Sequence, residues 1–153
     1  MTAQFSPEEH KNFAKACFNE TWTYLDRNDR TPDDDEKMIN VAHASRYHWS
    51  HVGGPTQFAR GEWQLSRVYS TVGRAEPAMR HARRCMEICK ANSLGAFDHA
   101  AAHEAIARAA AVGGDSGERK RNLDAGMALL AQVNDLEDRQ IVENDLKSVP
   151  ACS

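Results

Sequence analysis

The chain has 153 residues, of which 41% are hydrophobic and 27% are charged, and its formal net charge is -3 at pH 7. These values predict one globular domain over residues 1–153 and argue against a disordered tail or a strongly basic nucleic-acid-binding protein. Alanine occurs 23 times, whereas valine and isoleucine together occur 12 times, a balance that favours helices over strands. No apolar run approaches the roughly 20 residues of a membrane span, and the first residues lack the pattern of a secretory signal. We therefore expect an all-α protein of the cytoplasm that has no membrane or nucleic-acid partner.

Start and stop signals divide the chain into seven predicted helices. The segments Ser6–Glu9 and Thr31–Asp35 each combine a capping hydroxyl, a proline at the first helical position and acidic residues in the first turn. Glycines and Pro150 provide the stops. The short loops between them predict that consecutive helices are antiparallel neighbours. The predicted helices cover residues 7–28, 33–52, 55–72, 75–92, 96–112, 118–133 and 135–148.

The four cysteines give no redox or zinc motif. Cys85 and Cys89 are one helical turn apart, which is not the spacing of a C-x-x-C pair. Without a secretory signal, reduced thiols are the expectation. We therefore interpret these two residues as small side chains of the core.

Two consecutive helix pairs share one apolar pattern. Leu65 aligns with Ile106 and Gly73 with Gly114, at an offset of 41 residues. A single helix hairpin cannot bury its inner face alone, so a repeat of this kind predicts stacked hairpins.

About 35 residues around this first copy resemble the tetratricopeptide repeat family. The large, small, aromatic, glycine, alanine, packing and second small positions of that family fall, in this order, on Leu65, Ser66, Tyr69, Gly73, Ala78, Ala82 and Cys85. The second copy departs from the pattern, because Ala110 stands where an aromatic residue is usual and the period is longer than the family's 34 residues. The resemblance implies antiparallel hairpins stacked as a short right-handed array, with a concave groove lined by the first helix of each hairpin.

Carried over to this chain, the groove is expected to hold Trp63, Arg67 and Thr71 from one hairpin and Glu104 and Arg108 from the next. Arginines beside an aromatic ring suit a carboxylate-bearing or acidic peptide, since guanidinium groups grip carboxylates with two hydrogen bonds. The leading hypothesis is therefore a non-enzymatic module that binds a protein or peptide without a cofactor.

Three alternatives to an open groove remain at this point. The arginines Arg67 and Arg108 instead form ordinary ion pairs with Glu62, Glu104 or Asp26. The last predicted helix either caps the array or folds back and fills the groove. A third alternative is a homodimer that forms through Trp22 or Trp63.

The seven histidines support an alternative hypothesis of a different class. His99 and His103 have the one-turn spacing of two ligands on one helix face, and His48 and His51 form a second pair. A helical bundle can bring such pairs together into a metal site. Against this, a bare H-x-x-x-H lacks the glutamate of the H-E-x-x-H motif, and structural histidines explain the pattern as well.

Overall fold

The structure, a computed structural model, describes residues 4–153, which form seven α-helices and one 3₁₀ turn, η1, and contain no strand. The elements are α1 (Pro7–Leu25), α2 (Pro32–Val52), α3 (Pro55–Thr71), α4 (Ala75–Ala91), α5 (Ala96–Val112), α6 (Ser116–Leu129), η1 (Leu130–Gln132) and α7 (Leu136–Lys147). The prediction of an all-α fold with seven helices is confirmed. Its largest errors are at two ends: the first helix stops at Leu25 rather than at residue 28, and the sixth gives way to the turn η1 before residue 133.

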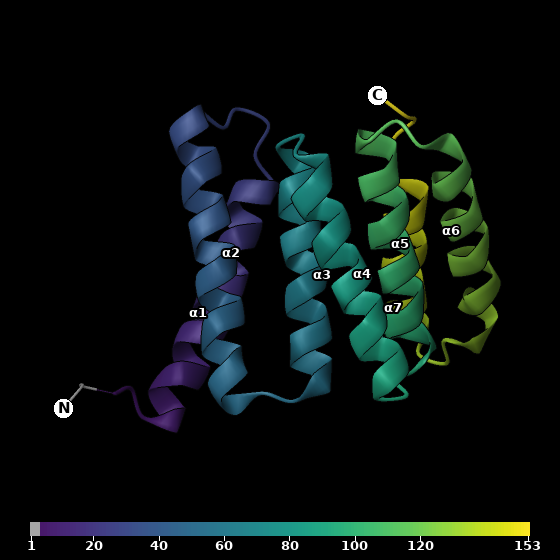
Figure 1. Cartoon of the computed structure of the whole chain (residues 1–153). Coiled ribbons are helices and arrows are strands. Elements are labelled where there is room, and N and C mark those ends of the chain that lie inside the picture. Colours follow the sequence, from purple (N-terminus) through teal and green to yellow (C-terminus); the bar gives the residue numbers. More distant parts are fainter. Residues whose placement is uncertain (1–3) are drawn as a thin grey trace.

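The helices are arranged as three stacked hairpins and a returning helix (Figure 1). The most extensive packing lies within the pairs α1–α2, α3–α4 and α5–α6, and the pairs then stack through α2 on α3 and α4 on α5. The first helices of the hairpins form a row, in which α3 packs on α5 but meets α1 at few points. Helix α7 returns along α5 and also touches α6.

The capping signals of the sequence are formed as hydrogen bonds. The Ser6 hydroxyl accepts from the backbone N–H of Glu9, and the Glu9 carboxylate accepts from the N–H of Ser6. Thr31 and Asp34 make the same reciprocal pair at the start of α2. These bonds satisfy N–H groups that have no partner within the helix, which explains why the helix starts were legible in the sequence.

Small residues allow the second and third hairpins to approach closely. The core between α3, α4 and α5 is built largely of alanines and the two cysteines, among them Ala59, Ala82, Ala102 and Ala105. At the far end, a Cβ atom on Gly126 of α6 would lie 2.7 Å from a methyl group of Leu146, so a larger residue here would force the Leu146 side chain to shift where α7 packs on α6.

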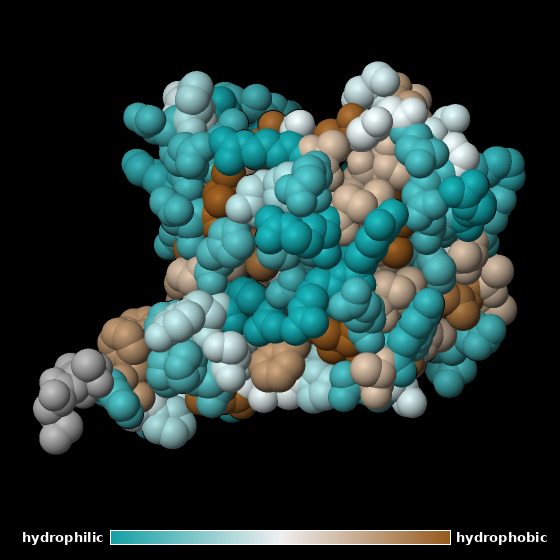
Figure 2. Space-filling model, in the orientation of Figure 1, coloured by the Kyte–Doolittle hydropathy of each residue, from teal (hydrophilic) through white to brown (hydrophobic). Residues whose placement is uncertain are grey.

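The face of the molecule seen in Figure 2 is covered mostly by hydrophilic residues, with hydrophobic residues in smaller patches between them. Across residues 4–153, no helix combines the length and the hydropathy that crossing a membrane requires.

Candidate functional site

Three of the predicted groove residues meet at the buried carboxylate of a fourth, Glu104. The Glu104 side chain is 1% exposed and accepts hydrogen bonds from Trp63 Nε1 at 3.0 Å and from an Arg67 Nη at 2.8 Å. Arg108, one turn along α5, also donates to it, with Nε at 2.9 Å. The ion-pair alternative is therefore confirmed, and Glu104 is the shared partner of both arginines.

Helix α7 closes this polar network from the other side. Asp145 Oδ1 lies 3.2 Å from Arg67, while Arg108 donates to the Asp145 carbonyl at 3.1 Å and to Ser148 Oγ at 2.7 Å. Arg67 and Arg108, predicted to line an open groove, instead form their hydrogen bonds with Glu104 and with the last helix, which folds back over them. Thr71 lies beyond the network, exposed, with its hydroxyl donating to the Arg67 carbonyl.

The electrostatics of this network indicate a structural role. Burial lowers the pKa of Arg67, but the charges of Glu104 and Asp145 outweigh that effect and leave the pKa raised. Burial raises the pKa of the Asp145 carboxyl and lowers the pKa of Arg108. Two arginines and two carboxylates balance in charge, so the network offers no net charge to a ligand.

The Arg67 guanidinium also lies over two indole rings. Its carbon Cζ is 5.9 Å from the centre of the Trp22 ring and 5.3 Å from that of Trp63. Its buried Nε finds no hydrogen-bond partner within residues 4–153. Arg67 thus holds α1, α3, α5 and α7 together at the point where the predicted groove was expected.

An open cavity lies beside the network, on the same side of the array. We call it the aromatic cavity; its volume is about 220 Å³, and it lies between α1, α3, α5 and α7, with one wall from α4. Its lining is mainly apolar, with carboxylates at two points. The residues that line it are Phe18, Trp22, Ala59, Arg60, Trp63, Cys85, Phe97, Asp98, Ala101, Ile141, Val142 and Asp145.

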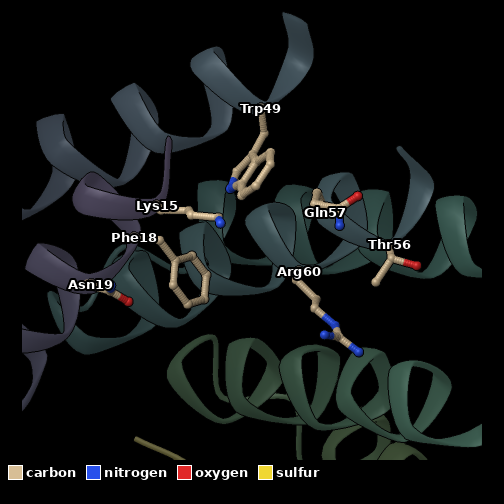
Figure 3. Close-up of a pocket in the computed structure, with 7 residues that line it drawn as sticks. All are labelled: Lys15, Phe18, Asn19, Trp49, Thr56, Gln57 and Arg60. Carbon is tan, nitrogen blue, oxygen red and sulfur yellow. The ribbon is translucent and has the colours of Figure 1, made fainter. Parts of the chain in front are cut away.

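A second, shallower depression, the rim hollow, adjoins the aromatic cavity and shares Phe18 and Arg60 with it. It has a volume of about 430 Å³ and is lined by residues of α1, α2 and α3. Figure 3 shows the Lys15 side chain of α1 extending toward the Trp49 indole of α2, with the Phe18 ring below Lys15 and Gln57 of α3 on the opposite side. The remaining lining residues are Asn19, Thr56 and Arg60.

The charges at the boundary of these two spaces are partly available to a ligand. Arg60 is half-exposed; its Nε donates to Asp98 at 3.0 Å, and its guanidinium lies 5.3 Å from the centre of the Phe97 ring. Lys15 is exposed and makes no ion pair in the described part of the chain. The cations that a ligand can reach are therefore Lys15 and Arg60, not the two arginines predicted from the sequence.

The histidines of the metal hypothesis are not brought together. His48 and His51 lie on α2 against His10 of α1, which is 2.9 Å from His48 between the Nδ1 atoms and stacks on the His51 ring at 4.1 Å. His99 and His103 lie on α5, where they bond to a backbone carbonyl and to an asparagine side chain. Among residues 4–153, no group of three or more His, Cys, Asp or Glu side chains is arranged to hold a metal ion. The four-histidine site of the alternative hypothesis is therefore not assembled.

Sequence reasoning identified Trp63 but missed Phe18, Phe97 and Ile141, which complete the aromatic cavity with it. The available signal was the position of Trp63 off the apolar stripe of its helix, and in the structure the Trp63 ring lies 5.8 Å from Trp22. No comparable signal marks the other three, because each becomes part of the site only through the packing of its helix.

Comparisons with protein-family models, with curated proteins and with solved structures found no match to this chain. The resemblance to tetratricopeptide repeats therefore stays a prediction. A functional conclusion has to come from the geometry of the site.

Proposed function

We propose that the chain is a non-enzymatic interaction module that binds a peptide segment of a partner protein on the side where α1, α3, α5 and α7 meet. The aromatic cavity is the single observation that carries this proposal. The interior between the hairpins is filled by side chains, but four aromatic rings here surround an open space of about 220 Å³. A bulky apolar side chain of a partner is the natural occupant of such a space.

The magnitudes favour an apolar anchor over charge as the source of affinity. Burying one large aliphatic or aromatic side chain contributes about 1.5–3 kcal/mol. An exposed ion pair, such as one between Lys15 and a partner carboxylate, contributes about 0–1 kcal/mol. We therefore propose a partner segment with an apolar anchor, and an acidic residue nearby that meets Lys15 in the rim hollow and orients the segment.

The proposed cellular location follows from the thiols. All four cysteines are free, including the half-buried Cys17 and Cys152. Free thiols fit a reducing compartment, so the cytoplasm is the location that we propose.

The test is a selection of binders from a random peptide library, performed on the wild-type protein. The matched variants are Ala101→Phe, which places a benzyl group in the aromatic cavity, and Ala128→Phe, which adds the same group at an exposed position of α6. Because Ala101 borders an open space, its replacement is expected to leave the fold intact, which a melting curve checks.

The proposal predicts enriched peptides that share one bulky apolar residue with an acidic residue close to it. These peptides should bind the Ala128→Phe variant as they bind wild type and lose about tenfold in affinity, or about 1.4 kcal/mol, for Ala101→Phe. A selection without enrichment, or peptides that bind all three proteins equally, would count against the cavity as the binding site.

A further inference from the structure

Two thiols lie together at the wall of the aromatic cavity. Cys85 and Cys89 are one turn apart on α4, so their side chains project from the same face of the helix. Cys85 lines the cavity, and Cys89 lies behind it, with its Sγ 3.6 Å from the carbonyl oxygen of Asp98. Both are free and buried. The prediction that both are core residues is confirmed, and in addition they form an adjacent pair of thiols beside an open apolar space.

The surroundings of Cys85 and Cys89 determine which class of sulfur-binding ligand the pair can hold. Zinc takes four protein ligands in structural sites, and no group of three or more candidate ligands exists in residues 4–153. A monovalent copper ion held by two thiolates would leave a net negative charge beside a mainly apolar lining whose Arg60 is already paired with Asp98, and burying such a charge is costly. Trivalent arsenic that carries one organic group takes two sulfur ligands and forms a neutral product. This class of ligand needs only the two sulfurs present and leaves no charge to bury.

We propose that Cys85 and Cys89 form a dithiol site for a trivalent organoarsenical whose apolar substituent lies in the aromatic cavity. This site goes beyond the proposed peptide binding and does not depend on it.

The reaction needs no oxidant or reductant. Both S–H bonds and the arsenic–oxygen double bond break, two arsenic–sulfur bonds form, and the two protons leave on the oxygen as water. A hydrogen bond from Cys85 lowers the pKa of Cys89, while the same hydrogen bond and burial raise the pKa of Cys85. Cys89 is therefore the more acidic thiol of the pair, whereas Cys85 is the thiol that a reagent reaches from the cavity.

The experiment uses phenylarsine oxide and the full chain with Cys17→Ser and Cys152→Ser, which leaves only the two thiols in question. Intact mass reports the addition of one phenylarsenic group with loss of water, and thiol titration after denaturation reports whether both sulfurs were consumed. The same reaction is run on this parent protein further changed by Cys85→Ser, by Cys89→Ser or by Ala101→Phe. A melting curve for each variant verifies that it is folded.

The proposal predicts one phenylarsenic group per folded chain, loss of both thiols, and a rate that rises with reagent concentration. Either serine variant should lose the bridged product, and Ala101→Phe, which fills the cavity, should slow bridging by about tenfold because thiol chemistry depends on access to the sulfur. Reaction that occurs only in denaturant would overturn the site. If Ala101→Phe did not change the rate of bridging, the organic group would not lie in the cavity. Neither result bears on peptide selection, so this proposal and the proposed function fail separately.

Discussion

Replacing Glu104 by alanine should destabilise the protein more than any other single change at the site. The carboxylate is 1% exposed and accepts hydrogen bonds from three side chains, two of them arginines that are themselves largely buried. Removing one partner of a buried ion pair costs about 3–5 kcal/mol, because the other charge is left without compensation. A chain of this size loses about 2–4 °C of Tm for each kcal/mol, so the expected loss is about 6–20 °C.

The assay is urea denaturation followed by tryptophan fluorescence, with a thermal melt by circular dichroism. The matched control is Glu87→Ala, which removes a carboxylate that is 69% exposed and lies 3.8 Å from Arg84. An exposed pair of this kind contributes about 0–1 kcal/mol, so the control should melt close to wild type. If Glu104→Ala were as stable as wild type, or if both variants lost the same amount, the buried network would not be what joins α3, α5 and α7.

Three further predictions concern pH and close packing. Burial, together with the charges of two neighbouring histidines, lowers the pKa of His48 below its ordinary value of 6.5. The imidazole of His48 therefore binds a proton more readily in the unfolded chain than in the folded one. The free energy of unfolding should be highest above about pH 6.5 and should fall as the pH drops below that value. In urea denaturation, His48→Asn should make this fall smaller. Gly126→Ala should cost about 1–3 kcal/mol and speed hydrogen exchange in α7, because the added methyl group would overlap Leu146; unchanged exchange would refute the close contact. Gly73→Ala should cost about 1–2 kcal/mol, since its φ is +79°, whereas Gly95→Ala, at the N-cap of α5 with a φ of -74° and open space around it, should cost less, about 0.5–1 kcal/mol.

The helices could be predicted because their signals are local. The capping boxes at Ser6 and Thr31 use residues three positions apart, and the glycine at position 73 adopts the left-handed conformation that its place after a helix suggested. Stacked hairpins followed from the apolar repeat in the same way. The caps and the glycine turn are decided within one or two helical turns, and the stacking of hairpins is visible because the same apolar pattern recurs 41 residues later.

The site could be predicted only in part, because it depends on contacts between distant segments. The repeat offset of 41 residues predicted that four residues lie near one another: Trp63, Arg67, Glu104 and Arg108. The structure confirms that they are in contact. The contact between Arg67 and Asp145 spans 78 residues, and no local pattern decides whether the last helix caps the array or crosses to this network. The open groove was therefore expected at residues that the chain uses for itself.

Dependence on contacts between distant segments also explains why the predicted histidine site is not assembled. His48 and His51 were paired with His99 and His103 because their spacing is visible in the sequence. Their actual neighbour, His10, stands alone in the sequence and reaches them only because α1 and α2 pack along each other. Spacing within a helix indicates which side chains share a face, but it does not indicate which other helix that face meets.

The most direct measurement of the central claim is the dissociation constant of one selected peptide for three proteins, determined by calorimetry. Wild type and Ala128→Phe should give the same Kd, and Ala101→Phe should bind about tenfold more weakly because its benzyl group occupies the aromatic cavity. Equal values for all three proteins, with Ala101→Phe shown to be folded, would contradict the claim that this cavity is where a partner binds.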